Sequence, residues 1–532
     1  MLLPALALAA ASPISADRIK ADVRSLSSDA FLGRGPGEAG EDKAIAYIVG
    51  QFAAAGLRPG GDRGGWYQDV PLVRLDREPG AAMVLDYGGT RMPLVPGRDA
   101  TLSLRNPGAT SLARAPLVFA GFGIVDEARG WNAYAGVDMR GKIAVVLAND
   151  PDFEAGRDLG FEGRRMALAG RVGVKFAAAE KAGAAGVLVI HEDAAASYPF
   201  LQVASGDALP AMAIAPLAPS ATFRMSGWLR RDVAVGLLER AGLDLAALKV
   251  GSRDPAFRAF ALPGATLSVT GRLRAREVVS HNVVGILPGA TRPGEYVLYG
   301  AHWDANGRNG PVAGDGIRNG AIDNATGTAE LIEVARAFAH GTRPARSVVF
   351  AAWTAEEKGL LGSEYYAAHP PYPLAKTAAM INLDPHVVLP AARNLELIGG
   401  GRVSLEADLR RAAAARDLSV VDEPAVEAGW YFRSDQFSFA RRGVPALTFR
   451  AGRDLLDGRL AKGRAIVADY NARRYHQPSD AFDPRWTFAG TAQEASVAFD
   501  VGLRLADGRD WPAWNAGNEY GAVRTASDGE RR

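Results

Sequence analysis

Short apolar runs alternate with longer helical patterns along the C-terminal half of the chain. The apolar runs include "EYVLYGAHWD" at 295–304, "RSVVFAAWTAEE" at 346–357 and "MINLDP" at 380–385, whereas "GTAELIEVARAFAHG" at 327–341 has the period of an amphipathic helix. Such alternation is typical of an α/β domain with a mainly parallel sheet and helices on both faces. Ligands bind these sheets beyond the carboxyl ends of the strands, so chemistry is expected there.

A second, smaller unit is expected between about residues 111 and 265. Segments such as "GKIAVVLAND" and "KFAAAEKAGAAGVLVIHE" combine short apolar runs with one helical pattern. Histidines and carboxylates do not cluster at the ends of these expected strands, so this stretch by itself indicates no chemistry. After about residue 508 the periodicity is lost and glycine and charge increase, which predicts an extended or partly disordered end.

The N-terminal segment "MLLPALALAAASPISADRIK" contains an apolar stretch that ends in small residues. It resembles a signal peptide over residues 1–16, although the positive n-region is missing; the alternative is the disordered or helical N-terminus of a cytoplasmic protein. The rest of the chain has no apolar run near the ~20 residues that span a bilayer. We therefore expect a periplasmic or secreted protein without stable membrane insertion.

Composition narrows the possible chemistry. The 532 residues carry a formal net charge of +2, which gives no strong field for nucleic acid or an anionic membrane. Cysteine does not occur, so thiol nucleophiles and thiolate metal sites are excluded. Any metal site must use His, Asp and Glu side chains.

Four consecutive predicted elements each present an acid or an imidazole at one end. Each alone has a structural explanation, such as a surface ion pair or a helix cap, and His476 in the turn "RRYHQPSD" would alone be typical of a solvated loop. Four such placements in an α/β order instead indicate a metal cluster. The residues concerned are His302 with nearby Asp304, Asp323, the adjacent pair Glu356 and Glu357, and Asp384.

Six motifs together resemble the co-catalytic di-zinc aminopeptidase family. They are "GAHWDANG", "NGAIDNATGTAELIEVARAF", "AAWTAEEKGLLGSEYY", "INLDP", "YFRSDQFSFARRGVPALTF" and "RYHQPSDAFD". That family includes bacterial secreted aminopeptidases, glutamate carboxypeptidase, the glutaminyl cyclases and the transferrin receptor. The resemblance implies a three-layer α/β sandwich with a mostly parallel central sheet and an inserted protease-associated domain.

The resemblance also implies a division of the chain. After the signal peptide, residues 17–110 would form the N-terminal part of the peptidase domain and 111–265 the protease-associated insert. Residues 266–508 would form the zinc metallopeptidase domain, and 509–532 a C-terminal tail.

Site roles follow from the same resemblance. His302, Asp323 and Asp384 would hold one zinc ion, and Asp323, Glu357 and His476 a second, so that Asp323 bridges the two. Glu356 would be the general base and Asp304 would orient His302. Tyr431 is the candidate for the residue that donates a hydrogen bond to the oxyanion. Its alternative role is that of an aromatic side chain packed within a loop. Gln436 stands where a histidine is expected in close relatives, which puts substrate contacts in doubt.

The motifs define the metals better than the substrate. The leading prediction is an aminopeptidase acting on peptides. A carboxypeptidase or dipeptidase on the same site is the nearest alternative, with Arg433 and Arg450 available for a free carboxylate. From another class comes a non-catalytic, receptor-like binding protein, against which the complete set of ligands and base argues.

Overall fold

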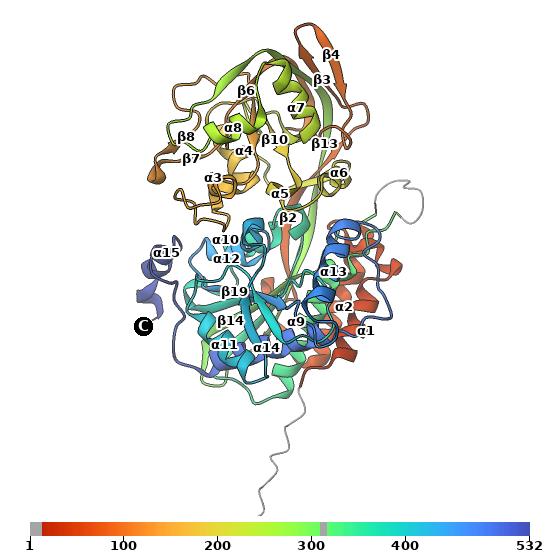
Figure 1. Cartoon of the computed structure of the whole chain (residues 1–532). Coiled ribbons are helices and arrows are strands. Elements are labelled where there is room, and N and C mark those ends of the chain that lie inside the picture. The colour runs from red at the N-terminus through yellow and green to blue at the C-terminus, as the bar shows by residue number, and fades with distance from the viewer. Residues whose placement is uncertain (1–12, 309–315, 532) are drawn as a thin grey trace, which may run out of the picture.

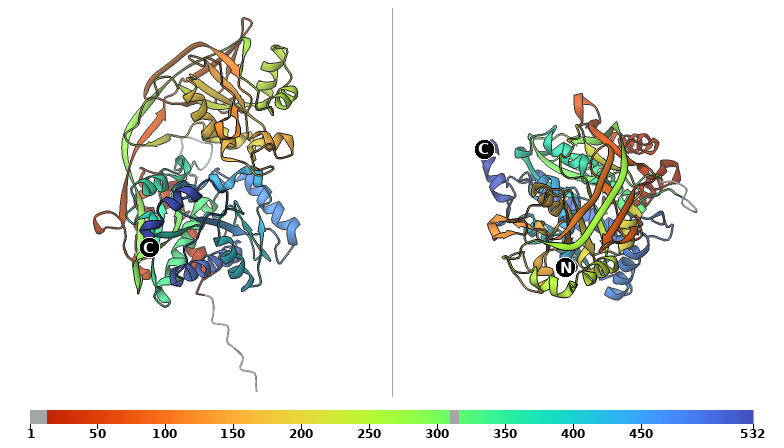
Figure 2. Two further views of the ribbon diagram at one scale, coloured as in Figure 1. Left: turned by 90° about the vertical axis from the view of Figure 1, so that its left-hand side faces the viewer. Right: turned by 90° about the horizontal axis from the view of Figure 1, so that it is seen from above.

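A long two-stranded ribbon joins a lower and an upper lobe (Figure 1). Strand β2 (Tyr67–Arg77) pairs antiparallel with β13 (Phe260–Leu287) along its whole length, from Tyr67 opposite Val283 to Arg77 opposite Leu273. Figure 2 shows the ribbon passing along one side of both lobes. The computed structural model describes residues 13–308 and 316–531.

The lower lobe has a central sheet of four parallel strands in the order β15, β14, β16, β19. Antiparallel strands flank it, since the end of β13 pairs with β15 and β17 pairs with β19. The new strands are β14 (Arg292–His302), β15 (Arg346–Trp353), β16 (Thr377–Asn382), β17 (Asn394–Leu397), β18 (Ser419–Asp422) and β19 (Ala446–Ala451).

Alternate side chains of these strands enter cores on opposite faces of the sheet. Tyr299 and Phe350 pack with one set of helices, and Leu298 and Val349 pack with the other. The first set is α1 (Ala16–Leu26), α2 (Ala39–Ala55), α9 (Gly327–His340), α11 (Leu405–Ala414), α13 (Arg459–Arg473) and α14 (Ala489–Asp507). The second set is α10 (Leu361–Ala368) and α12 (Gln436–Ala440). The expected α/β sandwich with a mostly parallel sheet is confirmed.

The upper lobe is built on parallel strands in the order β6, β9, β10, β12, and β6 continues the ribbon by pairing with β13. These strands are β6 (Gly108–Phe119), β9 (Ile143–Leu147), β10 (Gly186–His191) and β12 (Met225–Arg230). The helices of this lobe include α4 (Val172–Lys181), α6 (Phe200–Gly206), α7 (Arg231–Arg240) and α8 (Leu245–Gly251). Its main core also contains Val73, Met83 and Leu102. The predicted domain boundaries remain predictions, but the packing extends this core to residues before 111.

Both ends of the described chain pack against the lower lobe. Ile14 is buried in its core, and Ser15 lies at the start of α1, where its hydroxyl accepts a hydrogen bond from the Arg18 backbone N–H. The predicted signal peptide otherwise falls on residues 1–12, outside the described residues, and remains a prediction.

The expectation of an extended or disordered C-terminal end is wrong. Trp514 and Tyr520 are buried in the lower core, and Arg524 of α15 (Gly521–Ala526) donates to the backbone carbonyls of Thr377 and Ala378. The packing of three aromatic rings of this short segment against the lower core stabilises it more than its glycine content and charge destabilise it. Among the described helices, none combines the length and apolarity needed to cross a bilayer.

Candidate metal and catalytic centre

Neighbouring parallel strands bring the predicted metal ligands to one edge of the sheet. Strand β14 ends at His302, while Glu357 and Asp384 come shortly after β15 and β16. Asp323 lies in the turn Ala321–Thr326, directly before α9, and has a non-helical backbone conformation. His476 reaches the same place from the turn that follows α13.

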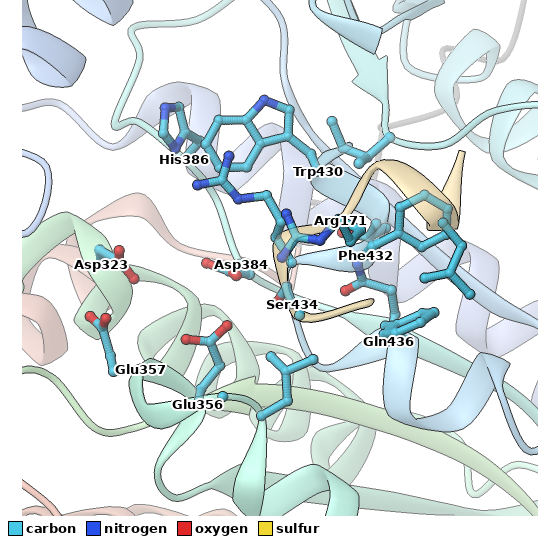
Figure 3. A pocket seen from close by; sticks show the side chains of 18 of the residues that line it. Arg171, Asp323, Glu356, Glu357, Asp384, His386, Trp430, Phe432, Ser434 and Gln436 are labelled. Atoms are coloured by element: carbon cyan, nitrogen blue, oxygen red, sulfur yellow. The ribbon is translucent and has the colours of Figure 1, made fainter. Parts of the chain in front are cut away.

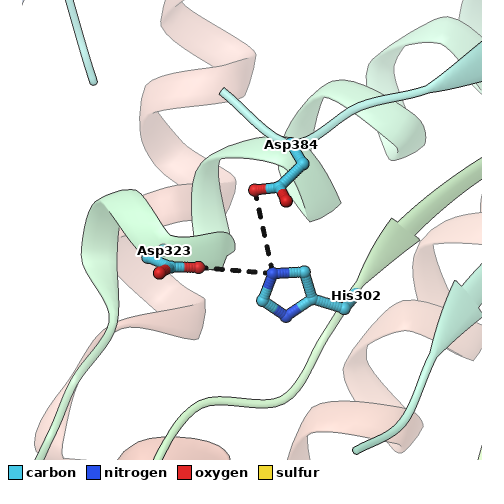
Figure 4. A group of neighbouring side chains, drawn as sticks. All are labelled: His302, Asp323 and Asp384. Atoms are coloured by element: carbon cyan, nitrogen blue, oxygen red, sulfur yellow. Dashed lines mark ion pairs between the residues drawn. The ribbon is translucent and has the colours of Figure 1, made fainter. Parts of the chain in front are cut away.

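The two carboxylate oxygens of Asp323 face two different imidazoles. Its Oδ1 lies 3.3 Å from Nε2 of His302, and its Oδ2 lies 3.2 Å from Nε2 of His476. Asp384 Oδ1 completes the first group at 3.8 Å from His302 Nε2 (Figure 4), and Glu357 Oε2 completes the second at 3.2 Å from His476 Nε2. The structure therefore forms two three-residue groups that share Asp323.

The donor set fits divalent zinc. Nitrogen from His and oxygen from Asp and Glu are the ligands zinc accepts when Cys is absent. The Nε2 atom of His302 is buried and makes no hydrogen bond to the residues that the structure describes, although two carboxylates point at it. Atoms arranged in this way around a common point are suited to a cation at that point.

The electrostatics also favour a cation. Burial alone would lower the pKa of His302 and of His476, but the carboxylates around them, Glu356 and Glu357 first, raise both values. Burial would raise the pKa of Asp323, yet the two imidazoles hold it well below its usual range. A negative field that retains protons on two imidazoles would attract a divalent ion as well.

Glu356 and Glu357 do not end a strand as the sequence suggested. Strand β15 stops at Trp353, Ala355 adopts a left-handed conformation, and Glu356–Lys358 form a 3-10 turn. The Asp304 carboxylate accepts hydrogen bonds from the backbone N–H groups of Glu356 (3.0 Å) and Glu357 (3.4 Å).

Asp304 also lies beside His302, but not as its nearest acceptor. The His302 Nδ1 atom is 3.2 Å from the backbone carbonyl oxygen of Asp304 and 3.6 Å from the carboxylate oxygen Oδ1. Orientation of the imidazole by residue 304 thus involves its main chain as well as its side chain. Another acid, Asp480, was not singled out from the sequence, and its Oδ2 accepts from the backbone N–H of Asp323 at 3.1 Å.

A cavity of about 620 Å³ opens beside the metal-binding groups (Figure 3). Glu356, Glu357, Asp323 and Asp384 line one part of it, and aromatic residues including Trp430 line another. The cavity also receives Arg171 from the upper lobe. The inserted stretch, which by itself indicated no chemistry, thus supplies a cationic side chain to the cavity, and no signal in the sequence marks Arg171.

Tyr431 does not line this cavity. A left-handed Gly429 starts the 3-10 turn Trp430–Phe432, and Tyr431 packs over Gly399 and under the Arg402 guanidinium, 4.8 Å from its ring. The phenol is buried away from the cavity, so the predicted role as donor to the substrate is not supported. Tyr475 lines the cavity instead. Its position next to His476 is the sequence feature from which this could have been predicted.

Gln436 lines the cavity and braces the loop around it. Its side-chain amide donates to the backbone carbonyl of Tyr431, and its Oε1 accepts from the Asn382 side chain at 2.8 Å. A glutamine provides a donor and an acceptor simultaneously. The departure from histidine at this position is therefore accommodated by the structure.

Comparisons with known proteins agree with this geometry. Residues 282–499 match the model of "Peptidase family M28". A "Probable zinc metalloprotease" of Pyrenophora teres is 42% identical over 102 residues, which are 19% of this chain and 22% of that protein. "Aminopeptidase NAALADL1" of Mus musculus is 40% identical over 124 residues, covering 22% of this chain and 15% of that protein. The chain thus matches less than a quarter of the length of these relatives.

A solved structure has a similar fold over nearly the whole chain. The "Aminopeptidase from Aneurinibacillus sp. strain AM-1" aligns with 93% of this chain and 94% of its own, with a TM-score of 0.54 and 20% identity. At that identity the likeness shows the fold alone. Residues 282–499, which contain every member of the two three-residue groups, are thus the part of the chain that matches peptidase family M28.

Proposed function

We propose that this chain is an aminopeptidase that uses two zinc ions to remove N-terminal residues from peptides. The observation that carries the proposal is Asp323, whose two oxygens face separate imidazoles at 3.3 and 3.2 Å. One ion would be held by His302, Asp323 and Asp384, and the other by Asp323, Glu357 and His476. Zinc in such a site acts as a Lewis acid and makes water a nucleophile near neutral pH.

Glu356 is the general base of this proposal. It belongs to neither ligand group, lines the cavity, and has Oε2 at 3.8 Å from His302 Nε2. Burial raises the pKa of Glu356 well above its ordinary value, which suits a carboxylate that takes a proton and returns it. Glu356 accepts the proton of the attacking water and later delivers it to the amine that leaves.

Tyr475 replaces Tyr431 as the proposed donor to the scissile carbonyl oxygen. Its side chain lines the cavity, and burial raises the pKa of its phenol well above the usual value. The phenol therefore keeps its proton at neutral pH and can donate a hydrogen bond where negative charge develops.

A carboxypeptidase or dipeptidase is the second candidate. The cavity contains Arg433 and Arg450, which suit a free carboxylate, and a "Glutamate carboxypeptidase 2 homolog" of Caenorhabditis briggsae is 38% identical over 125 residues. The non-catalytic, receptor-like alternative is less favoured, because the side chains proposed as ligands and general base are all present at the site.

Hydrolysis of aminoacyl-anilides, before and after removal of metal by a chelator, tests the proposal. We expect turnover that is lost on chelation and restored by zinc. A protein that binds zinc but hydrolyses neither anilides nor C-terminally free dipeptides would instead support the receptor-like alternative.

A further inference from the structure

The two imidazoles of the metal-binding groups are supported differently. The His302 side chain is 1% exposed and lies at the end of β14 inside the lower lobe, where the Thr328 hydroxyl donates to its backbone carbonyl at 2.8 Å. The His476 side chain is 31% exposed and lies in a turn, and its backbone φ is 58°. This left-handed conformation is unfavourable for a residue with a Cβ, so the turn depends on the contacts that hold it.

Helix α6 of the upper lobe (Figure 1) caps the helix that leads into the turn of His476. Helix α13 ends at Arg473, and the carbonyl groups of the last turn of a helix have no partner within that helix. One of them, the Asn471 carbonyl, accepts a hydrogen bond of 2.7 Å from the side-chain amide of Gln202 in α6. Gln202 is buried, so water competes little for this bond.

Two further contacts join α6 to the turn itself. The Gln477 side-chain amide donates to the Ser205 hydroxyl at 2.9 Å, and this hydroxyl donates to the Gln202 carbonyl at 3.0 Å. The buried Arg318 guanidinium donates to the backbone carbonyls of both His476 and Ser205. The main chain of the predicted ligand is therefore connected to the upper lobe immediately beside its imidazole.

The two metal-binding groups thus differ in what holds them. The His302 group comprises His302, Asp323 and Asp384, and the His476 group comprises Asp323, Glu357 and His476. We propose that Gln202 and Ser205 are positioning residues for His476, so that the affinity of the His476 group for zinc depends on the upper lobe. The inference rests on the two-zinc site of the proposed function and adds the residues that keep one of its ligands in place.

A different contact between the lobes provides a matched control. Arg164 of the upper lobe pairs with Glu427 of the lower lobe at 2.9 Å, through the turn Val426–Ala428 and not through the turn of His476. Arg164→Met therefore weakens the contact between the lobes without removing a hydrogen bond from the segment that carries the ligand.

Zinc affinity and zinc position together test the proposal. Gln202→Met and Ser205→Ala remove the two side-chain bonds from α6 with little change in volume. In the double variant, competition with a chromophoric chelator should show one zinc ion bound about tenfold more weakly, the lower end of the effect of residues that orient metal ligands. In crystals equilibrated at limiting zinc, the anomalous peak of the His476 group should be lost before that of the His302 group. Arg164→Met should behave as wild type does.

Three results would overturn the inference. They are zinc affinities equal to those of wild type, an equal weakening of both ions, and the same effect in Arg164→Met, since the last two would reflect general loosening of the protein.

Failure of the two-zinc site itself is recognised separately, because wild type would then bind fewer than two zinc ions. Hydrogen exchange of the metal-free protein decides the inference in that case. The backbone amides of Tyr475, Gln477 and Asp480 are hydrogen-bonded in and beside this turn. They should exchange faster in the double variant than in wild type and Arg164→Met, and equal exchange would overturn the positioning role.

Discussion

Adjacent glutamates at the edge of the sheet have different surroundings. Glu357 Oε2 lies 3.2 Å from His476 Nε2, within a metal-binding group, whereas Glu356 borders the cavity outside both groups. Their backbone N–H groups share the Asp304 carboxylate. In the proposed mechanism, one turn would therefore supply a ligand and a base to the same centre.

Glu356→Gln should separate catalysis from metal binding. The amide keeps the shape but cannot accept the proton, so we expect kcat to fall roughly 10²–10⁴-fold while zinc content stays near that of wild type. Glu357→Gln is the matched comparison, and should lose zinc and melt at a lower temperature as well as losing activity. Loss of zinc in Glu356→Gln with retention in Glu357→Gln would mean that the roles are exchanged.

The clustering of His302, Asp323, Glu357 and Asp384 could be predicted from the sequence because the ends of consecutive α/β elements meet at one edge of the sheet. His476 lies in a turn and was assigned only by the resemblance. Tyr431 could not be placed correctly, because the turn that begins after Gly429 directs Trp430 and Phe432 to the cavity and Tyr431 away from it. Arg171 belongs to another lobe, and its approach to the site depends on tertiary packing that no local pattern encodes.

Asp304 connects the ends of β14 and β15. Asp304→Asn keeps one acceptor oxygen but removes the charge that steadies the turn of Glu356 and lies 3.6 Å from His302 Nδ1. We expect zinc affinity to fall about 10- to 100-fold, as for other residues that orient ligands. Competition with a chromophoric chelator measures the affinity, and an unchanged value would show that Asp304 does not support the metal-binding groups.

Helix α4 carries a buried lysine that should make the stability of the upper lobe depend on pH. Lys175 is fully buried, donates to the Phe122 carbonyl at 2.6 Å, and has its pKa lowered by burial from 10.5 to about 7. Between these two values the unfolded chain binds more protons than the folded chain, so stability rises with pH in that window. The cost of burying Lys175 is greatest below pH 7 and disappears above pH 10.5.

Replacing Lys175 by Met should therefore raise the melting temperature, relative to wild type, by more at pH 6 than at pH 10. A difference of roughly 10 °C between the two pH values is expected for a lobe of this size. Scanning calorimetry of the variant and wild type at both pH values measures it. Parallel shifts at the two pH values would show that Lys175 has the same charge in the folded and unfolded chain.

The two lobes are linked by a ribbon whose extent was not predictable. Strand β13 runs for 28 residues and pairs with strands of both lobes, while the upper core includes side chains from Val73 onward. Composition marked a change near residue 111, but composition cannot reveal that earlier strands pack into the same core.

The packing of the upper core determines which residues must be deleted to remove the upper lobe. Asp76 lies opposite Arg274 in the ribbon, so Asn-Gly can join them as a two-residue hairpin in place of residues 77–273. We expect a folded lower lobe that binds zinc and that cleaves long peptides, relative to short ones, faster than the full chain does. An unchanged preference across a peptide-length series would contradict a role of the upper lobe in the cleft.

The central claim is that Asp323 joins two metal ions in one centre. A crystal of the zinc-loaded protein, with anomalous diffraction recorded on both sides of the zinc absorption edge, tests it most directly. The claim predicts two zinc peaks flanking the Asp323 carboxylate, one bordered by His302 and Asp384 and the other by Glu357 and His476. A fully loaded crystal with no peak beside Asp323, or with a single peak that contacts only one of the two groups, would contradict it.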